Sequence, residues 1–460
     1  MSVTTILLFI IFIIVYRFLT KKSSSNQLSL PPGPIPLPFI GCTIQMLLNK
    51  QNFPGWIHKF MDKYDTPILC IRLGPSTHVV VVSSPDLACE FLKKQDEVFI
   101  SRPDFMSAYL ISGGYLTATV SPFSEHWRKM KSIVNQEMLS PRIHKWLQPK
   151  RDKEADLVLR YICNQIEKQD AIVDGGLINL HIVSQHFFGN LVRNMVFGKR
   201  LFGQGMEDGG PGEEETEAMD ALFTILKYVY AFCITNYLPW LRWKTDFDGH
   251  EYIMRNAIDI VRKYQDPLIN ERIQLWNNGD RKEKCDLLDV LITHENPKLT
   301  PEVIKAQTVE LMIATIDNTS NVIEWAIGEM IKEPLILKRA VEELDHVVGR
   351  KKLVEECDLR QLNYLKACIK ETFRLHPFVP FLPLHVSTKD TTIAGYFIPK
   401  SSHVILSRFG LGRNQNVWED PLRYDPDRHL RGEGKQVFLS DNDLKLISFS
   451  TGNRGCPAIM

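Results

Sequence analysis

The pattern of apolar and polar positions along the chain predicts a mainly helical protein with a small amount of β-sheet. Between about residues 85 and 380, apolar residues recur at helical spacing, and most such stretches begin near a capping residue or a proline. Short runs of β-branched residues at 67–74, 78–84, 391–400 and 402–407 are typical of strands. We therefore expect a mainly α protein of the α+β type, with one large helical domain and a small sheet region.

The first apolar stretch has no polar face. Val3–Tyr16 carries no charge, and Arg17, Lys21 and Lys22 follow it. Its length is about that needed to span a bilayer, and positive charge only after the run keeps the following residues in the cytosol. A cleaved signal peptide is the alternative, but neither a basic start nor a small-residue cleavage site is evident. We expect a transmembrane signal anchor at residues 1–20.

A polar and then proline-rich segment follows the expected anchor. Five prolines lie in the eight residues from Pro31 to Pro38, a composition that excludes helix and central strand and favours a stiff extended chain. We interpret residues 21–40 as a linker that fixes how the body sits against the membrane, or as a generic linker. The main domain is expected at residues 41–460.

Composition narrows the class of protein. The formal net charge of +1 gives no support for nucleic-acid binding, which leaves a basic excess. The nine cysteines are scattered, odd in number and free of CxxC pairs, which is typical of a reducing compartment and not of a disulfide scaffold or a zinc module. Only Cys456 has a sequence context that asks for a chemical explanation.

That context is the run FSTGNRGCPA, residues 449–458. Its glycines permit backbone turns that leave amide N–H groups free to point at the Cys456 sulfur, and Arg454 adds a positive charge nearby. Both effects stabilise the thiolate, the form that binds metal. A single thiolate is a poor zinc site, since structural zinc takes four ligands, but it suits the axial position of haem iron.

The pattern FxxGxRxCxA resembles the haem-ligand signature of the cytochrome P450 monooxygenases. The resemblance implies the cytochrome P450 fold and a haem b cofactor with Cys456 as its metal ligand. Phe449, Gly452 and Arg454 are the matching signature residues and are expected to contact the cofactor.

The run KETFRLHP adds a second resemblance. Glu371 and Arg374 are three residues apart and therefore face the same side of a helix, which for an unrelated protein would indicate an ordinary surface ion pair. In the monooxygenases this ExxR pair is completed by an arginine from a downstream loop, and YDPDRHL offers Arg428. We expect a buried structural cluster that braces the cysteine loop, since a buried carboxylate needs its cationic partners.

Two further segments carry expected cofactor contacts. EHWRKMKS resembles the family's WxxxR, so Trp127 and Lys131 are expected to meet a haem propionate, with Arg128 sharing that role. The alternative for this segment is a simple amphipathic helix. By the same resemblance, His385 is expected to reach a propionate.

The run ELMIATIDNTSNVIEWA places five consecutive polar residues, Asp317 to Asn321, inside a strongly apolar helix. Such residues are unfavourable in a buried helix unless they serve a purpose. By resemblance, the catalytic positions are a small residue that opens the helix for dioxygen, an acid, and a proton-delivering threonine. Here these positions hold Thr315, Asp317 and Asn318.

The asparagine in place of threonine resembles one branch, the plant amino-acid N-monooxygenases. The resemblance implies N-hydroxylation of an amino acid to an aldoxime with O2, and electrons from NADPH–cytochrome reductase, at the endoplasmic reticulum membrane with a cytosolic catalytic domain. It names no particular amino acid. The alternatives are carbon hydroxylation of another plant metabolite and a catalytically inactive, truncated relative.

Several positions depart from the branch. Thr319 stands where proline is usual, and Asn453 replaces a second arginine. The branch usually carries an asparagine and then Pro-His after RLHP, whereas the matching run here holds Leu382 and Leu384 before His385. Leu382 is therefore apolar where a polar group is expected to face the distal pocket. The family's helix and β-hairpin beyond the cysteine would lie after Met460. We expect their lack to expose apolar surface and to weaken the bond between cysteine and iron.

Overall fold

The computed structural model describes residues 28–459 except 169–176, 201, 204, 242–245, 247 and 431–435. The expected membrane anchor, residues 1–20, lies outside the described residues. The chain divides into two compact units, each built from three stretches of sequence. The first comprises Met1–Pro103, Phe232–Asp248 and Pro383–Ser407, and the second Asp104–Ala231, Gly249–Leu382 and Arg408–Met460.

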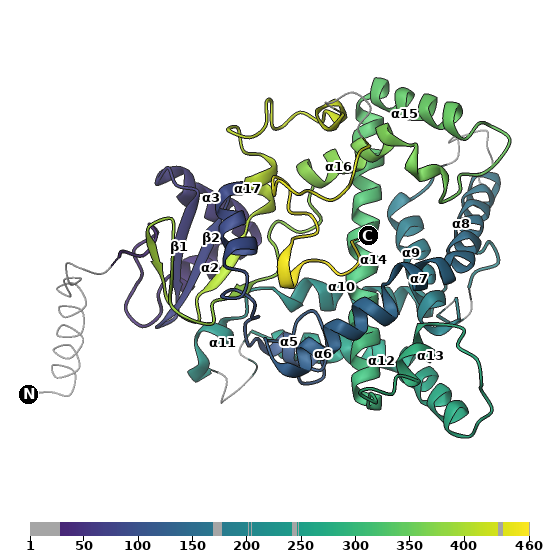
Figure 1. Ribbon diagram of the computed structural model, residues 1–460, viewed down its shortest axis with the longest axis horizontal. Helices are drawn as coiled ribbons and strands as arrows, with labels where there is room; N and C mark the ends of the chain where they lie inside the picture. Colours follow the sequence, from purple (N-terminus) through teal and green to yellow (C-terminus); the bar gives the residue numbers. More distant parts are fainter. Residues whose placement is uncertain are drawn as a thin grey trace, which may run out of the picture. The chain divides into compact units, whose positions relative to one another are not determined.

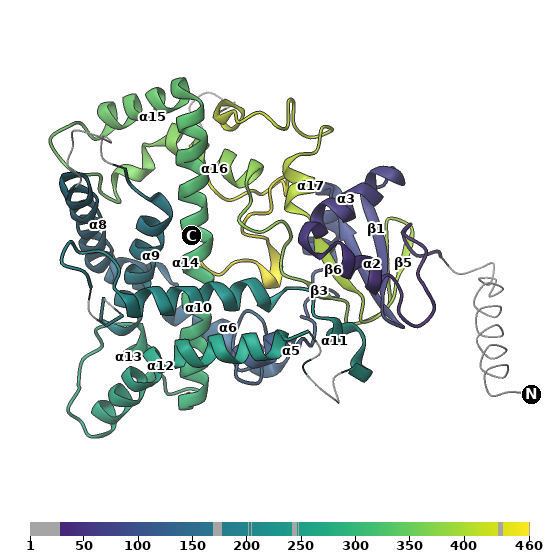
Figure 2. The same ribbon diagram turned by 180° about the vertical axis from the view of Figure 1, so that it is seen from behind.

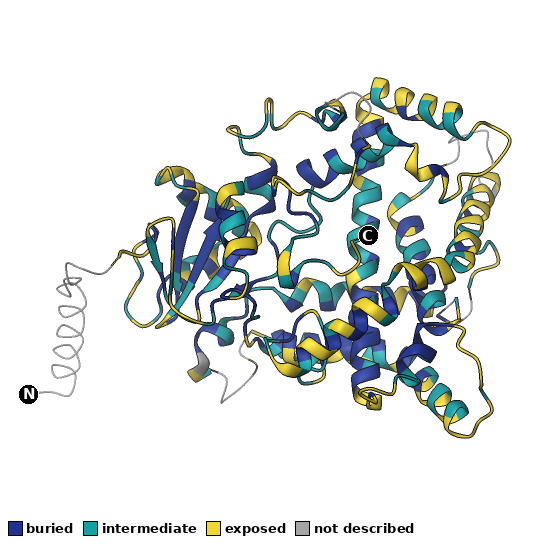
Figure 3. Cartoon of the chain, in the orientation of Figure 1, coloured by how far each residue is buried: buried dark blue, intermediate teal, exposed yellow. Residues whose placement is uncertain are grey.

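The first unit contains a four-stranded mixed sheet in the order β1-β2-β6-β3 (Figure 1). β1 (Ile68–Leu73) pairs antiparallel with β2 (Thr77–Val82), β2 runs parallel to β6 (His403–Leu406), and β3 (His385–Val386) is antiparallel to β6. The strands predicted from β-branched runs are therefore confirmed, and early and late stretches of sequence share one sheet. β1 and β2 are almost wholly buried (Figure 3), which fits their near-continuous apolar sequences.

Short helices and a hairpin complete this unit. The hairpin pairs β4 (Thr391–Ile393) with β5 (Tyr396–Ile398). The helical elements are α2 (Thr43–Leu48), η1 (Lys50–Asn52), α3 (Phe53–Lys63), α4 (Pro85–Cys89), η2 (Glu90–Lys94), α11 (Ile234–Tyr237) and η4 (Pro239–Leu241).

The proline-rich segment packs directly against β1. The amide of Cys70 donates a 2.8 Å hydrogen bond to the Pro32 carbonyl. A Cβ at Gly33 would lie 1.8 Å from the Cys70 carbonyl oxygen, so only glycine fits this close approach. From about residue 31 the segment is thus part of the first unit.

The second unit is helical and is organised around α14 (Pro301–Lys332), the long helix in Figures 1 and 2. α9, α10, α12, α15 and α16 all contact it. The unit's elements are α5 (Met106–Ile111), α6 (Glu125–Ile133), η3 (Val134–Met138), α7 (Pro141–Trp146), α8 (Gln148–Lys168), α9 (Leu180–Phe197), α10 (Glu213–Val229), α12 (His250–Asn277), α13 (Leu287–Ile292), α14, α15 (Pro334–Val347), η5 (Asp358–Arg360), α16 (Asn363–Leu375), α17 (Arg408–Gly412), η6 (Pro426–His429) and η7 (Gly452–Arg454).

Local sequence explains the ends of α14. The Thr300 hydroxyl accepts a hydrogen bond from the Val303 amide, and Pro301 occupies the first turn, where its missing N–H costs nothing. Pro334 follows the C-terminus and begins α15. The mainly helical architecture with a small sheet is therefore confirmed.

Among the described residues, one segment is long and apolar enough to cross a membrane. This segment, Glu213–Tyr237, has a mean hydropathy of 1.4 and 44% of its apolar window is buried. Its α10 portion packs on α12 and α14, and a core helix of this kind meets the same criteria. It therefore adds no support for a second anchor.

Candidate active site

The cysteine loop is a tight turn closed by its own backbone. The Cys456 amide donates to the Phe449 carbonyl at 2.8 Å, and the Gly455 amide donates to the Gly452 carbonyl at 3.1 Å. Gly452 has a φ of +71°, the left-handed region that glycine adopts without strain. The Phe449 ring makes an edge contact with Phe373 of α16, with centroids 5.5 Å apart, which fixes the loop on the helical unit.

The electrostatic surroundings of Cys456 differ from those expected from the sequence. Burial raises the pKa of the Cys456 thiol, and the Ala458 and Ile459 amides together with the charge of Arg408 oppose that rise. The amides that act on the sulfur thus follow the cysteine and do not come from the glycine turns before it. Arg454, although only two residues away, is not the cation responsible.

Arg454 instead belongs to a cluster with Trp127 and Lys131. Its guanidinium lies 3.9 Å from the centre of the Trp127 ring, and its Nη2 donates to the Ser121 carbonyl at 2.9 Å. The Lys131 ammonium donates to the Asn453 carbonyl and lies 5.4 Å from the same ring. Two cations are therefore gathered on one indole, an arrangement that could bind an anionic group through charge-assisted hydrogen bonds.

Two further residues, Arg128 and His385, were expected to contact the cofactor. Arg128 is exposed, and its guanidinium sits 4.7 Å from the ring centre of Phe123, so the structure does not bring it into the Trp127 cluster. His385 belongs to the first unit, on β3, where its Nδ1 is 2.9 Å from the Phe99 carbonyl.

Sequence reasoning missed Arg408, at the start of α17. Its side chain is only 5% exposed. Its Nη2 donates to the Ser448 carbonyl at 2.7 Å, but among the described residues Nη1 has no hydrogen-bond partner. Burial lowers the pKa of Arg408 to about 9, and attraction to Cys456 opposes that shift. No motif marked this residue, because its partners are backbone atoms of a loop 40 positions away.

The residues present fit a haem with an axial thiolate. The donor set is one sulfur, which is adequate for haem iron and inadequate for zinc. Among the described residues, the Arg408 Nη1 and the Ser448 and Ser450 hydroxyls are buried around the cysteine loop without hydrogen-bond partners. Unsatisfied buried polar atoms are costly in a finished site, so they favour an additional polar or anionic group there.

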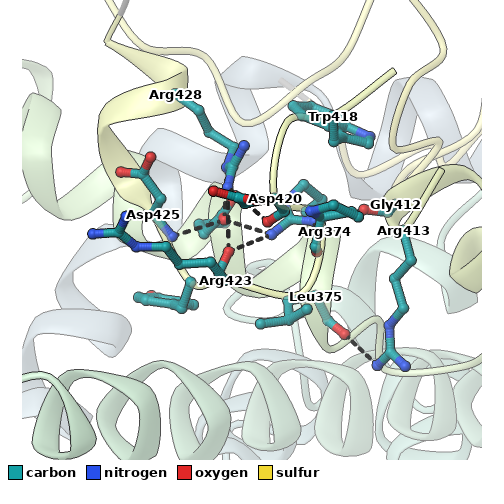
Figure 4. Close-up of polar contacts among 12 residues, drawn as sticks. Arg374, Leu375, Gly412, Arg413, Trp418, Asp420, Arg423, Asp425 and Arg428 are labelled. Atoms are coloured by element: carbon teal, nitrogen blue, oxygen red, sulfur yellow. Dashed lines mark hydrogen bonds and ion pairs between the residues drawn. The ribbon is translucent and has the colours of Figure 1, made fainter. Parts of the chain in front are cut away.

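The ion cluster of Glu371, Arg374 and Arg428 is present and fully buried at its centre. Arg374 donates two hydrogen bonds of 2.7 and 2.8 Å to Glu371, and the Arg428 Nε donates to Glu371 at 2.9 Å. Arg374 also donates to the Gly412, Pro421 and Arg423 carbonyls (Figure 4). It thus ties α16 to the chain between α17 and η6.

Two partners of Glu371 were not expected. His429 Nε2 lies 2.8 Å from its Oε2, and the Asp425 amide donates to its Oε1 at 2.9 Å. Burial alone would raise the pKa of Glu371, but the hydrogen bonds from His429 and Arg374 outweigh it and hold the pKa at about 2. The run YDPDRHL contains both missed residues. Histidine often pairs with a carboxylate, and His429 directly follows Arg428, so the sequence offered a signal that His429 also contacts Glu371.

The three catalytic candidates on α14 differ in what their side chains do. Asp317 is partly buried, and burial raises its pKa, with a hydrogen bond from Asn321 opposing the rise. Thr315 and Asn318 instead donate to helix carbonyls four residues earlier, at 2.8 and 3.0 Å. Of the three, Asp317 has the chemistry of a group that holds and releases a proton.

The same back-bonding explains how α14 tolerates its polar run. The Thr319 hydroxyl donates to the Thr315 carbonyl, and the Ser320 hydroxyl donates to the Ile316 carbonyl at 2.7 Å. Each hydroxyl is satisfied within the helix, so α14 continues without interruption through the position where the branch carries proline. Leu382 and Leu384 are both buried, at 2% and 9% exposure.

Comparison with known proteins places these features in context. A model described as "Cytochrome P450" matches residues 31–457. The chain is 51% identical to valine N-monooxygenase 1 of Manihot esculenta, over 95% of this chain and 80% of the relative. It is 49% identical to tyrosine N-monooxygenase of Sorghum bicolor (93% and 77%) and 47% identical to isoleucine N-monooxygenase 1 of Lotus japonicus (99% and 85%).

Proposed function

The chain belongs to the cytochrome P450 family, and from this premise we propose that it is a haem-thiolate monooxygenase that hydroxylates the amino group of an amino acid. The observation that carries the proposal is its near-50% identity, over most of its length, to relatives named for that reaction on valine, tyrosine and isoleucine. The names of those relatives include both aliphatic and aromatic substrates. The proposed substrate class is therefore the α-amino acids, and an assay must identify which substrate side chain is accepted.

The overall chemistry is two successive N-hydroxylations. Each consumes one O2, two electrons and two protons, inserts one oxygen atom into an N–H bond and releases one water. Loss of CO2 and a further water from the dihydroxylated amino acid then gives the aldoxime. Electrons come from NADPH through a reductase. When bound, the haem supplies the activation of dioxygen, and this chain's residues supply binding, orientation and protons.

Residues of the second unit would hold the haem. In this proposal the Cys456 sulfur is the axial ligand, and the Trp127 cluster (Trp127, Lys131 and Arg454) takes a propionate. The Phe449 carbonyl and Gly452 fix the loop that presents the sulfur. Glu371, Arg374 and Arg428 act at a distance, because they brace the chain that leads to that loop.

Asp317 would supply the protons. A carboxyl whose pKa is raised by burial carries its proton at a pH nearer neutrality and releases it more readily than a hydroxyl. Asn318 and Thr315 present amide and hydroxyl groups on the same helix. In this proposal they contact the substrate or an ordered water.

We also propose the location: residues 1–20 anchor the chain in the endoplasmic reticulum membrane, with residues 41–460 as a cytosolic catalytic domain that accepts electrons from NADPH–cytochrome reductase. The described chain after the anchor supports a membrane-facing position, because residues 28–48 expose an unusual number of apolar side chains. These are Leu28, Leu30, Ile35, Leu37, Phe39, Ile44, Leu47 and Leu48.

The proposal is tested by expressing the chain in membranes together with an NADPH–cytochrome reductase. A panel of the protein amino acids is supplied one at a time, and aldoximes are sought by mass spectrometry, with 18O2 to show the origin of the oxime oxygen. An NADPH-dependent, 18O-labelled aldoxime from at least one amino acid supports the function. Oxidation of side-chain carbon without any oxime, by protein that shows the thiolate-ligated spectrum, would overturn it.

A further inference from the structure

Arg408 is a buried cation that none of the roles above explains. Four contacts hold it in place, and all of them are to residues of the second unit. Its backbone amide donates to the Pro380 carbonyl at 2.9 Å, and its guanidinium lies 4.3 Å from the ring centre of Phe378. Its Nη2 and Nε donate to the Ser448 and Ile447 carbonyls at 2.7 and 3.4 Å.

These contacts position the charge but do not neutralise it. Among the described residues, Arg408 forms no ion pair with a carboxylate, and its Nη1 donates to no acceptor. Burying an unpaired guanidinium costs several kcal/mol. By contrast, Arg374, which is also buried, donates hydrogen bonds from its side chain to Glu371 and to three backbone carbonyls. A buried cation without a counter-charge therefore indicates an anion that completes the site.

The cysteine loop lies directly beyond the carbonyls that Arg408 holds. Ser448 precedes Phe449, and the Phe449 carbonyl accepts the Cys456 amide at 2.8 Å. Two hydrogen bonds, joined through the backbone of Ser448 and Phe449, thus link the Arg408 Nη2 to the residue that carries the sulfur. Arg454, the other nearby cation, lies on the Trp127 ring and donates to the Ser121 carbonyl.

We propose that Arg408 is a positioning residue whose buried charge faces the anionic unit formed by the Cys456 thiolate and the haem iron, and that this charge sets the reduction potential of the iron. The inference rests on the proposed axial ligation by Cys456. A fixed positive charge favours the more negative, reduced state of a neighbouring redox centre, so Arg408 makes the iron easier to reduce by the electron donor.

The test is an equilibrium redox titration of the haem-loaded protein in membranes or detergent. Arg408→Gln removes the charge and keeps one amide donor for the Ser448 carbonyl. We expect its oxidised-to-reduced ratio at a given potential to rise at least tenfold, which for one electron is a fall of about 59 mV. Arg408→Lys keeps the charge, and we expect a shift of less than threefold even if the protein is less stable.

Arg413 offers a control on the adjoining chain that differs in burial, because its side chain is exposed and that of Arg408 is buried. Its guanidinium lies 4.4 Å from the Phe409 ring and donates to the Leu375 carbonyl at 2.8 Å (Figure 4), so it has the same kinds of partner without the cysteine loop. Arg413→Gln is expected to leave the potential unchanged.

Outcomes for this inference and for the proposed function are separable. A parent protein that lacks the spectrum of thiolate-ligated haem would contradict axial ligation by Cys456 itself. A normal spectrum with an unchanged potential in Arg408→Gln would overturn only the role of Arg408. If Arg408→Gln loses its haem, the titration of Arg408→Lys is the test. A tenfold shift in its oxidised-to-reduced ratio, despite the retained charge, contradicts the inference. A reduction potential equal to that of the parent supports it.

Discussion

Arg374 donates two hydrogen bonds of 2.7 and 2.8 Å to Glu371, and neither side chain is exposed to solvent. Both residues lie on α16, one turn apart, and Arg428 and His429 approach the same carboxylate from η6. The cluster therefore joins a helix to a loop region that has little regular structure of its own. Its integrity bears on the whole chain from α17 to Cys456.

Removing the charge of Glu371 is expected to destabilise the protein strongly. Glu371→Gln leaves Arg374 and Arg428 buried without a counter-charge, and breaking one partner of a buried pair costs about 3–5 kcal/mol. The free energy of unfolding from urea titration measures this. The surface pair of half-buried Asp345 and exposed Arg350 is the control, and Asp345→Asn is expected to leave the urea midpoint almost unchanged. Equal effects of the two substitutions would contradict a structural role for the cluster.

The same carboxylate predicts how stability depends on pH. Its pKa in the folded protein, about 2, lies below its ordinary value of 4.5, so the ionised form is favoured by folding. The stabilisation is present above about pH 4.5 and is lost as the pH falls towards 2. Urea titrations at a series of pH values should show the advantage of the parent over Glu371→Gln narrowing below pH 4.5. An advantage that grows on acidification would be inconsistent with the lowered pKa.

Substitution in the Trp127 cluster is expected to weaken haem binding before it unfolds the protein. Lys131→Met removes one cation but keeps the aliphatic stem, so the affinity for haem should fall by about tenfold or more. Haem per polypeptide, measured by absorbance and protein assay, reports the change. Arg128→Met is the control, because the Arg128 side chain is exposed and rests on Phe123. Equal losses from both variants would show that the grouping of Lys131 with Trp127 and Arg454 has no special role.

Asp317→Asn is expected to slow N-hydroxylation about 100-fold or more, because an amide cannot release the proton that a carboxyl with a raised pKa holds. Folding should not suffer. The raised pKa means that the ionised carboxylate is disfavoured in the folded state, so stability falls as the pH rises above the ordinary value of 3.8. At neutral pH the variant should unfold at a urea concentration no lower than the parent. Full activity in Asp317→Asn would exclude Asp317 as the proton donor.

The sequence could predict the features that depend on short-range pattern. Apolar periodicity located α14 and the strands, and the three-residue spacing of Glu371 and Arg374 correctly implied one helix face. The pairing of β2 with β6 could not be read in this way, because 320 residues separate Val82 from His403 and only packing decides which strands meet. Division of the chain into two units of interleaved segments has the same origin.

Side-chain direction is the feature of the site that sequence spacing could not predict. Arg454 is close to Cys456 in sequence, yet its guanidinium lies on the Trp127 ring and donates to the Ser121 carbonyl. Arg408 is distant in sequence and belongs to no motif, yet its charge acts on the sulfur. The Thr315 hydroxyl and the Asn318 amide on α14 donate to the helix's own carbonyls in this structure, an option that Thr and Asn always have and that sequence spacing does not reveal.

The most direct test of the central claim is the carbon-monoxide difference spectrum of the reduced protein in membranes, recorded for the parent and for Cys456→Ser. Axial ligation by the Cys456 thiolate predicts a red-shifted Soret band in the parent and its loss in the variant at equal protein level. No such band in the parent, or an undiminished band in Cys456→Ser, would contradict the assignment of Cys456 as the haem ligand.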